Sequence, residues 1–305
     1  MAILRNLVAA AALLLANPCA AQNPAAIYDG GYGNDTQVKL RIGNGGAGQS
    51  GLIEVLANAF IKDQVDQGKP KFSVAWYTSD TTYSIQYLKT GLIDVGITYV
   101  PAAEQIAIKQ GIASWPSQTV FRDHFLLVGP KSNPAKLSES DDLDTMFSKI
   151  REAAEGPATT PPTRFLSRYD KSATNIKEAL LWVGIGQTPW ATTYSTWYHQ
   201  YIAFPIQALT AAIVLEEYTI TDRGTILSLD PALADRTVIY KAGGDGLSDP
   251  LLNPAQLLVG KKAPNPDMAR AFASWLSGSK GQKIIANFKK NGQQLYTPAP
   301  PGLSF

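Results

Sequence analysis

The sequence has little material for thiol or metal chemistry, since its 305 residues include one cysteine and two histidines. Cys19 lies in the first twenty residues, and His124 and His199 fall in no HxxxH or Cys/His spacing. Zinc sites use three or four such ligands at characteristic spacings. Each histidine is therefore interpreted as a packed or surface residue, and no metal site is predicted.

Strong charge of one sign is also missing. The chain has 27 Lys and Arg against 25 Asp and Glu, with no basic block and no acidic tail. This balance argues against nucleic acid or a membrane surface as the main partner. After the N-terminus, no apolar run approaches the length of a transmembrane helix, so no membrane insertion is predicted.

The one long apolar run opens the chain, in "MAILRNLVAAAALLLANPCAAQ". A cation at Arg5, an apolar segment and then small residues form the pattern of a secretory signal peptide. We expect residues 1–20 to be removed together with Cys19, leaving a secreted periplasmic or extracellular chain without disulfides. A lipoprotein anchor on Cys19 is the alternative, which Pro18 disfavours. A sequon at Asn34 permits glycosylation in a eukaryotic source, so the kingdom stays open.

Without the leader roughly 285 residues remain, enough for two domains. Strands and helices alternate along them. After an irregular lead-in at 22–37, apolar periodicity predicts the following elements. Strands are expected at 38–42, 72–77, 93–99, within 122–135, at 164–167 and at 225–228. Helices are expected at 51–66, 81–90, 142–154, 173–184 and 204–216, with two more in the tail after Asn265. Such alternation implies parallel sheets covered by helices.

Patterns typical of catalysis are absent from this chain. No GxSxG nucleophile turn is present, and the pairs Asp141/Asp142 and Glu216/Glu217 fall on polar helix faces, where they are interpreted as solvated charge. The sequence therefore predicts a protein that is not an enzyme.

A glycine-rich turn after the first strand leaves three interpretations open. Gly43, Gly45 and Gly48 form GxGxxG between a strand and a helix, as in dinucleotide sites. Those sites also place an acidic residue about 20 residues on, whereas Asp80 lies 32 residues beyond Gly48. The alternatives are a tight turn without a ligand and a loop that binds some other anion.

Two further strand-to-helix turns favour the anion site. Residues 164–180, "RFLSRYDKSATNIKEAL", place four polar side chains at a helix start, namely Ser167, Arg168, Ser172 and Thr174. A helix N-terminus offers free N–H groups and partial positive charge, and arginine adds a planar set of donors. The turn "WYTSDTTYS" adds hydroxyls at Thr78, Ser79, Thr81 and Thr82. The alternative for Arg168 is a surface salt bridge.

Several motifs in fixed order resemble those of one family. They are "GQSGLIEVLANAF", "LKTGLIDVGITYVPAAE", "FLLVGPKSNPA", "SRYDKSATNIKE", "EYTITDRGT", "LLNPAQLLVG" and "ASWLSGSKGQKIIANF". From about Lys39 to Pro298 the chain therefore resembles the tungstate-binding proteins of ABC importers, which have the type II periplasmic-binding-protein fold.

The resemblance implies an α/β fold of two lobes, each a mostly parallel sheet flanked by helices, with a ligand cleft between them. Lobe 1 is expected at 37–127 plus 250–305, and lobe 2 at 128–249. The implied ligand is a small oxyanion such as tungstate or molybdate, with no cofactor. The implied partner is an ABC permease if the source is bacterial, and the protein is expected to be a monomer.

The resemblance also implies roles for individual residues. Ser167, Arg168, Ser172 and Thr174 match the anion loop of the second lobe, which Asp170 orders, while Asp222 and Arg223 match a motif interpreted as structural. Donors from the first lobe are expected from Thr81, Thr82, Gly45 and Gly46.

The chain also departs from the family pattern. "GNGG" (43–46) replaces a hydroxyl-bearing loop, Asp80 places a carboxylate near the expected anion, and "YIAFPI" (201–206) replaces a glycine-rich segment. Two alternatives therefore remain. The same fold could take a different small ligand, or it could take none if Tyr201, Phe204 and Ile206 fill the cleft.

Overall fold

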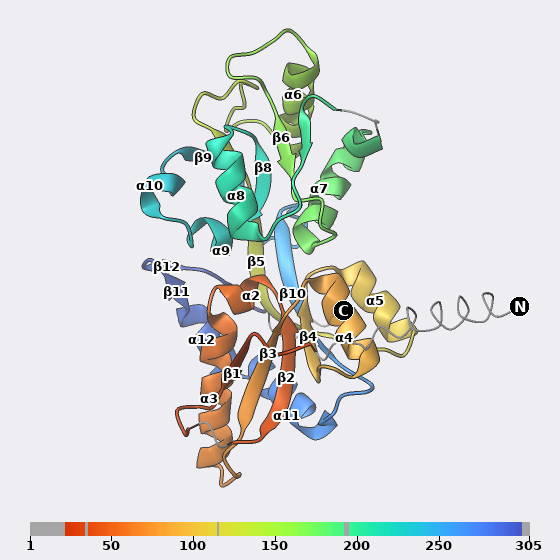
Figure 1. Cartoon of the computed structure of the whole chain (residues 1–305), viewed down its shortest axis with the longest axis vertical. Helices are drawn as coiled ribbons and strands as arrows, with labels where there is room; N and C mark the ends of the chain where they lie inside the picture. The colour runs from red at the N-terminus through yellow and green to blue at the C-terminus, as the bar shows by residue number, and fades with distance from the viewer. Residues whose placement is uncertain (1–21, 34–35, 115, 192–194, 301–305) are drawn as a thin grey trace, which may run out of the picture.

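The computed structural model describes residues 22–33, 36–114, 116–191 and 195–300, arranged as two lobes joined by a narrow waist (Figure 1). The expected leader with Cys19, and the sequon at Asn34, lie outside these residues. Over the described ranges, no helix is both long and apolar enough to cross a membrane.

Lobe 1 is built on a mixed sheet whose strand order is β1-β3-β2-β4-β10-β5-β13. Its strands are β1 (Ala26–Tyr28), β2 (Val38–Asn44), β3 (Ser73–Thr78), β4 (Val95–Thr98), β10 (Leu252–Val259), the first half of β5 (Gln118–Pro130) and β13 (Thr297–Pro298). Its helices are α2 (Gly46–Gln49), α3 (Leu52–Asp66), α4 (Thr81–Thr90), α5 (Pro101–Lys109), α11 (Pro266–Ser277) and α12 (Ser279–Asn287). A short hairpin of β11 (Lys289–Lys290) and β12 (Gln293–Gln294) precedes β13.

The core of lobe 1 forms where helical apolar stripes meet the sheet. Leu52, Leu56 and Phe60 recur at helical spacing on α3, and all three are fully buried. The ring of Phe60 packs edge-on against Phe272 of α11, with centroids 5.1 Å apart. Helices from both ends of the sequence thereby cover one face of the same sheet.

Lobe 2 contains the middle of the chain. Its strands are the second half of β5, β6 (Phe165–Ser167), β7 (Tyr198–Gln200), β8 (Thr219–Asp222) and β9 (Thr237–Ala242). Its helices are α6 (Leu143–Glu155), α7 (Ala173–Gly184), the 3₁₀ turn η1 (Pro189–Ala191), α8 (Pro205–Val214), α9 (Arg223–Ile226) and α10 (Pro231–Ala234). Its core centres on Trp182, which contacts the rings of Phe147, Phe165 and Trp197.

Two strands, β5 and β10, cross the waist side by side (Figure 1). Strand β5 pairs with β10 up to His124, and from Phe125 onward it pairs with β8 and β9 of lobe 2. The two-lobed α/β fold expected from the sequence is confirmed, but the sheets are mixed rather than mostly parallel. Among the described strands, only β2 with β3 and β4, and β6 with β7, pair in parallel. The crossing strand β10 runs antiparallel to both β4 and β5.

Two local expectations are wrong. Residues 225–228 form no strand, because Asp222 accepts a hydrogen bond from the Thr225 N–H at 2.8 Å and starts the short helix α9 instead. The lead-in at 22–37 is not wholly irregular, since β1 pairs with β3.

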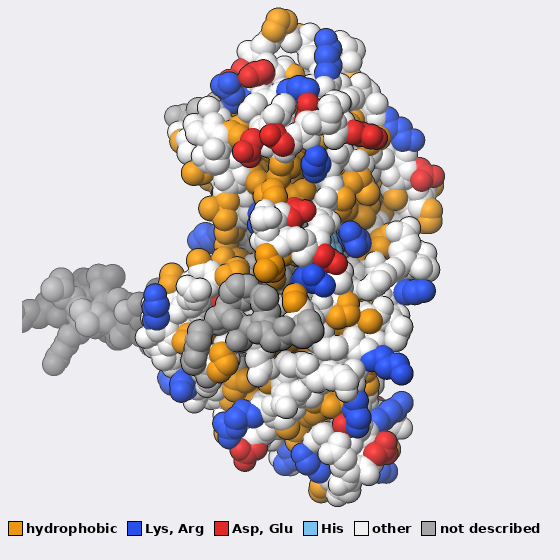
Figure 2. Space-filling view, turned by 180° about the vertical axis from the view of Figure 1, so that it is seen from behind, with side chains coloured by type: hydrophobic (Ala, Val, Ile, Leu, Met, Phe, Trp, Pro, Cys, Tyr) orange, Lys and Arg blue, Asp and Glu red, His pale blue; other side chains and the backbone are white. Residues whose placement is uncertain are grey.

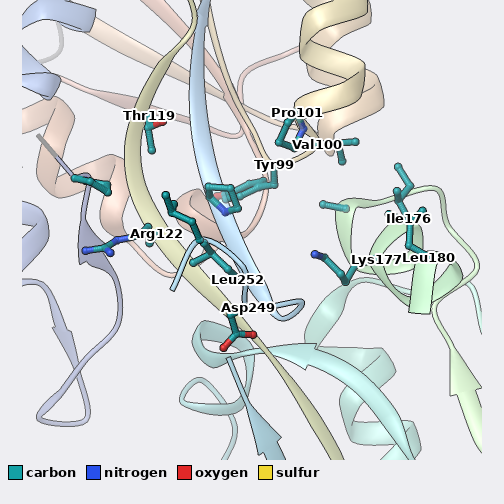
Figure 3. A pocket seen from close by; sticks show the side chains of 14 residues that line it. Tyr99, Val100, Pro101, Thr119, Arg122, Ile176, Lys177, Leu180, Asp249 and Leu252 are labelled. Carbon is teal, nitrogen blue, oxygen red and sulfur yellow. The ribbon is translucent and has the colours of Figure 1, made fainter. Parts of the chain in front are cut away.

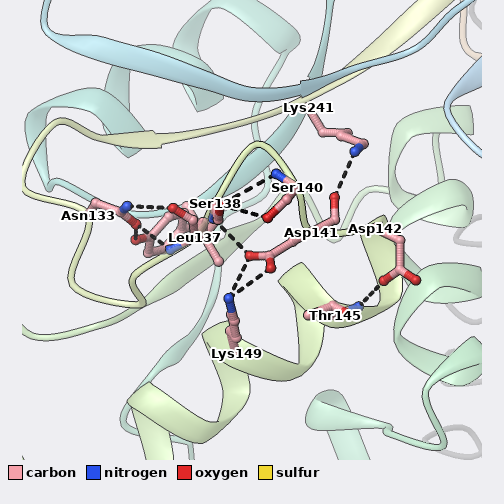
Figure 4. A network of polar contacts seen from close by, with 10 residues as sticks. Asn133, Leu137, Ser138, Ser140, Asp141, Asp142, Thr145, Lys149 and Lys241 are labelled. Carbon is pink, nitrogen blue, oxygen red and sulfur yellow. Dashed lines mark hydrogen bonds and ion pairs between the residues drawn. The ribbon is translucent and has the colours of Figure 1, made fainter.

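Asp141 and Asp142, two of the carboxylates expected to be solvated, have defined structural partners (Figure 4). Asp141 binds Lys149 at 2.7 Å, and Asp142 caps α6 by accepting the Thr145 N–H at 2.8 Å. For Glu217 the expectation of a solvated charge is wrong, because this residue is buried and its Oε2 lies 2.9 Å from His199 Nδ1. None of these carboxylates lines the cleft between the lobes.

Candidate functional site

A cleft of about 1190 Å³ separates the lobes. Its floor is formed by Asp123 and Phe125 of β5 and Asn253 of β10, so the two crossing strands supply it. Its walls are the strand-to-helix turns of the two lobes. Seen from behind, hydrophobic side chains gather around the waist (Figure 2).

The lobe 2 wall is centred on Arg168, in the loop between β6 and α7. Arg168 Nη1 donates to the Thr174 hydroxyl at 3.2 Å, and Nη2 forms an ion pair with Asp170. Asp170 also accepts the Ser172 N–H at 3.0 Å, and the Ser172 hydroxyl caps α7 by accepting the Asn175 N–H at 3.3 Å. Asp170 therefore bonds to two residues of this loop, in agreement with the ordering role that the family resemblance implies.

The same loop holds an unused donor. Arg168 is only 10% exposed, yet its Nε has no hydrogen-bond partner. The neighbouring residues Tyr169 and Lys171 adopt left-handed backbone conformations, at φ 45° and 61°. Such conformations are uncommon for residues with side chains and tend to occur at binding sites. The loop thus combines a strained backbone with Arg168, a residue that lines the cleft and has one N–H without a partner.

Ser167 does not reach the cleft. It is buried, and its hydroxyl donates to Glu178 Oε2 at 2.5 Å. Glu178 also accepts from the Tyr198 hydroxyl at 2.8 Å, and burial raises the pKa of its carboxyl. Ser167 therefore supports the loop from below, whereas Arg168, Ser172 and Thr174 line the cleft.

The lobe 1 wall is the first turn of α4. Thr81 and Thr82 both line the cleft. The Thr81 hydroxyl accepts the Tyr99 N–H at 3.2 Å, and the Thr82 hydroxyl donates across to the Lys171 carbonyl at 3.4 Å. This bond joins the two lobes at the rim of the cleft.

Asp80 introduces a carboxylate into this wall. It caps α4 by accepting the Tyr83 N–H at 2.8 Å. Burial raises its pKa, and the charge of Asp170 across the cleft raises it further, while Arg168 acts in the opposite direction. These interactions place Asp80 within electrostatic reach of the lobe 2 loop.

The glycine-rich turn contributes Gly45 and Gly46 to the cleft, but packing explains the other glycines. A Cβ on Gly48 would meet the Trp76 indole at 2.2 Å, and one on Gly43 would meet Ile93 at 2.5 Å. Helix α2 begins within this turn, at Gly46, and has only four residues. The GxGxxG spacing therefore reflects tight packing of the turn, which does not favour a dinucleotide site.

A pair of carboxylates at the floor was not predicted. Asp123 is buried and accepts from Asn253 Nδ2 at 3.2 Å, while Asp222, read from sequence as structural, caps α9. Burial raises the Asp123 pKa well above its usual range, and the nearby charge of Asp222 raises it further. The two residues lie 99 positions apart in sequence, so no local pattern signals their proximity.

The cleft is open rather than filled by the segment 201–206. Phe204 lines it but is 62% exposed, and neither Tyr201 nor Ile206 is among the residues that line it. Tyr201 instead packs beside a small core of Leu166, Ala208 and Ala212.

A second, smaller cavity of about 350 Å³ is also lined by both lobes (Figure 3). It is formed by Val100 and Pro101 at the start of α5, by Ile176 and Leu180 of α7, and by residues of the crossing strands. Leu252 and Pro254 face this cavity whereas Asn253 faces the cleft, so alternate residues of β10 serve the two spaces.

The fold and the cleft define a class of protein. A PBP superfamily domain matches residues 30–280, so the chain belongs to this superfamily of periplasmic-binding-protein-like domains.

Within that class, the chain is similar to proteins named for the metals or oxyanions they bind. A periplasmic protein of known structure, described as a candidate metal-binding protein, is 64% identical, with a TM-score of 0.85 and coverage of 90% of this chain and 99% of that one. The tungstate-binding protein TupA of Peptoclostridium acidaminophilum is 28% identical over 257 residues, covering 82% of this chain and 81% of the relative. The tungstate ABC transporter structure from Geobacter sulfurreducens is 27% identical, with a TM-score of 0.65 and coverage of 82% and 98%. These relatives are named for binding and transport rather than for catalysis.

Proposed function

We propose that this protein is a secreted solute-binding protein that clamps a small oxyanion between its two lobes. The Nε donor of Arg168 carries the proposal. The guanidinium is already bonded to Asp170 and Thr174, but a buried N–H that has no hydrogen-bond partner is costly unless a ligand completes it. The N-terminus of the twelve-residue helix α7 adds free N–H groups and partial positive charge at the same place.

The names of the relatives support the choice of ligand. A metal carried as an oxyanion, such as tungstate or molybdate, agrees with the names of both the metal-binding and the tungstate-binding relative. Within the described ranges, no group of three His, Cys, Asp or Glu residues is placed to hold a bare cation. A cleft that binds through N–H and hydroxyl donors fits an oxyanion better.

The clamp works by a shift between open and closed forms. The ligand first binds the Arg168 loop of lobe 2, and closure about β5 and β10 brings Thr81, Thr82, Gly45 and Gly46 against it. We assign lobe 1 to 37–127 plus 250–305, together with the preceding strand β1 of the same sheet, and lobe 2 to 128–249, with residues 1–20 as the export signal. The closed monomer then docks on an ABC permease if the source is bacterial.

A different small ligand is the second candidate, and the carboxylates favour it. Asp80, Asp123, Asp170 and Asp222 all line the cleft, where each repels a dianion unless it is protonated or paired.

The test is thermal unfolding of the mature chain with tungstate, molybdate, sulfate and phosphate. A ligand at a hundred times its dissociation constant stabilises the folded state by about 2.7 kcal/mol. We expect a shift that Arg168→Gln abolishes. The control Arg151→Gln removes an arginine of α6 that pairs with Glu155 away from the cleft. An equal shift in wild type and Arg168→Gln would refute the clamp.

A further inference from the structure

Large apolar side chains on the cleft walls are open to solvent. Tyr83 is 58% exposed, Ile202 75% and Phe204 62%, and all three line the cleft. Exposed apolar side chains scattered singly are ordinary on soluble proteins, but those gathered on one concave surface mark a binding site. These apolar side chains contribute nothing to the binding of a bare oxyanion.

These side chains flank the proposed anion anchor from both lobes. The Tyr201 N–H donates to the Ser167 carbonyl at 2.8 Å, so the segment that carries Ile202 and Phe204 leaves from beside the Arg168 loop. On the other wall, Tyr83 lies in the first turn of α4 and its N–H binds Asp80, whose charge interacts with Arg168. Polar anchor and apolar walls therefore form one site.

The size of the cleft exceeds what an oxyanion needs. At about 30 Å³ for each water molecule, a five-atom oxyanion displaces only a few, whereas apolar clefts of about 300–1,000 Å³ hold organic ligands. The cleft of about 1190 Å³ is not simply a wide gap, because the bond from Thr82 to Lys171 already joins the lobes at its rim.

We infer that the anion at Arg168 is the head group of an organic ligand whose aromatic or branched apolar body packs between Tyr83 of lobe 1 and Ile202 and Phe204 of lobe 2. The inference rests on the proposed function, since it takes Arg168 as the anchor. Closure buries the body between the two walls, and aromatic rings supply large contact areas there. A bare oxyanion fills only the polar end of the site.

The test compares matched anions by isothermal titration calorimetry on the mature chain. Methylphosphonate is set against phenylphosphonate, and acetate against phenylacetate, so that the two members of each pair share the anionic group and differ by the apolar body. The phenyl compounds are expected to bind tighter by roughly tenfold or more, because their rings leave water on binding. Phe204→Ala and Tyr83→Ala should each lower this ratio severalfold. Leu180→Ala, which removes an exposed leucine of the second cavity, should leave it unchanged.

The outcomes separate the two proposals. Equal affinity within each pair, tight binding of tungstate alone, or no binding of any phenyl compound overturns the inference. If Arg168→Gln removes binding of the parent anions while the phenyl group gives no gain, the anion clamp stands and only the apolar subsite fails. If Arg168→Gln changes nothing for any probe, the proposed function itself fails.

Discussion

Replacing Glu104 should change how the folded state responds to pH. Glu104 lies in the first turn of α5 and is 1% exposed. Its Oε1 accepts from the Thr98 hydroxyl at 2.8 Å and the Val100 N–H at 3.0 Å, but Oε2 is buried without a partner. Burial raises the pKa of Glu104 from 4.5 to about 7. The carboxylate form is therefore disfavoured in the folded protein.

The sign and size of the effect follow from proton linkage. Between pH 4.5 and 7 the folded state holds a proton that the unfolded state has lost, so stability falls as pH rises through this range. At about 1.4 kcal/mol for each pKa unit, the loss amounts to about 3 kcal/mol once the pH exceeds 7. Gln at this position keeps both accepted hydrogen bonds and never ionises.

Urea unfolding of wild type and Glu104→Gln from pH 4 to pH 8.5 measures this difference directly. The variant is expected to gain on wild type as pH rises, with most of the change between pH 5 and pH 7.5. Glu152→Gln, an exposed glutamate of α6, is the matched control and should show no such trend. A constant difference between Glu104→Gln and wild type over the whole range would refute the role given to burial.

Three further predictions concern the cleft and the core. Asp80→Asn should keep the α4 cap, since Asn caps as well as Asp. Calorimetry should show oxyanion affinity raised several-fold, because unit charges about 8 Å apart at an effective dielectric of about 40 repel by about 1 kcal/mol. Asp123→Asn should raise the melting temperature at pH 8 and not at pH 4, because the raised pKa makes its ionised form costly at the higher pH. Trp182→Ala should cost about 3–5 kcal/mol in urea unfolding. Val183→Ala, at an exposed position, should cost within about 0.5 kcal/mol. Unchanged oxyanion affinity in Asp80→Asn would contradict the first prediction, and a raised melting temperature at both pH values in Asp123→Asn would contradict the second. Equal losses of stability in Trp182→Ala and Val183→Ala would contradict the third.

The sequence predicts elements well where local signals mark their ends. Helix α4 runs over 81–90 as expected, because Asp80 caps its start and Gly91 takes the left-handed conformation at its end. Helix α7 likewise follows its Ser172 cap over 173–184. The direction of β10 is harder to predict, because the residues of a strand do not determine which other strand it pairs with.

The same difference between local signals and tertiary contacts applies to the candidate site. Arg168, Ser172 and Thr174 lie within one loop and helix start, so a short motif suffices to place them near the cleft. Ser167 belongs to the same motif, but β-strand alternation turns it inward to Glu178. The pairing of Asp123 with Asp222 depends on β5 meeting β8, which is a tertiary contact. Whether the predicted residues bind a ligand stays a prediction.

The placement of β10 has a consequence for how the chain is made. In the lobe 1 sheet this strand lies between β4 and β5, yet it is translated after all of lobe 2. A chain that emerges N-terminus first can complete lobe 2 while the lobe 1 sheet still lacks its inner strand. Until residues 252–259 are available, β4 presents an unpaired edge, which is a hazard for aggregation. The lobe 1 sheet, whose first strands are synthesised early, is therefore completed only when the last strands of the chain become available.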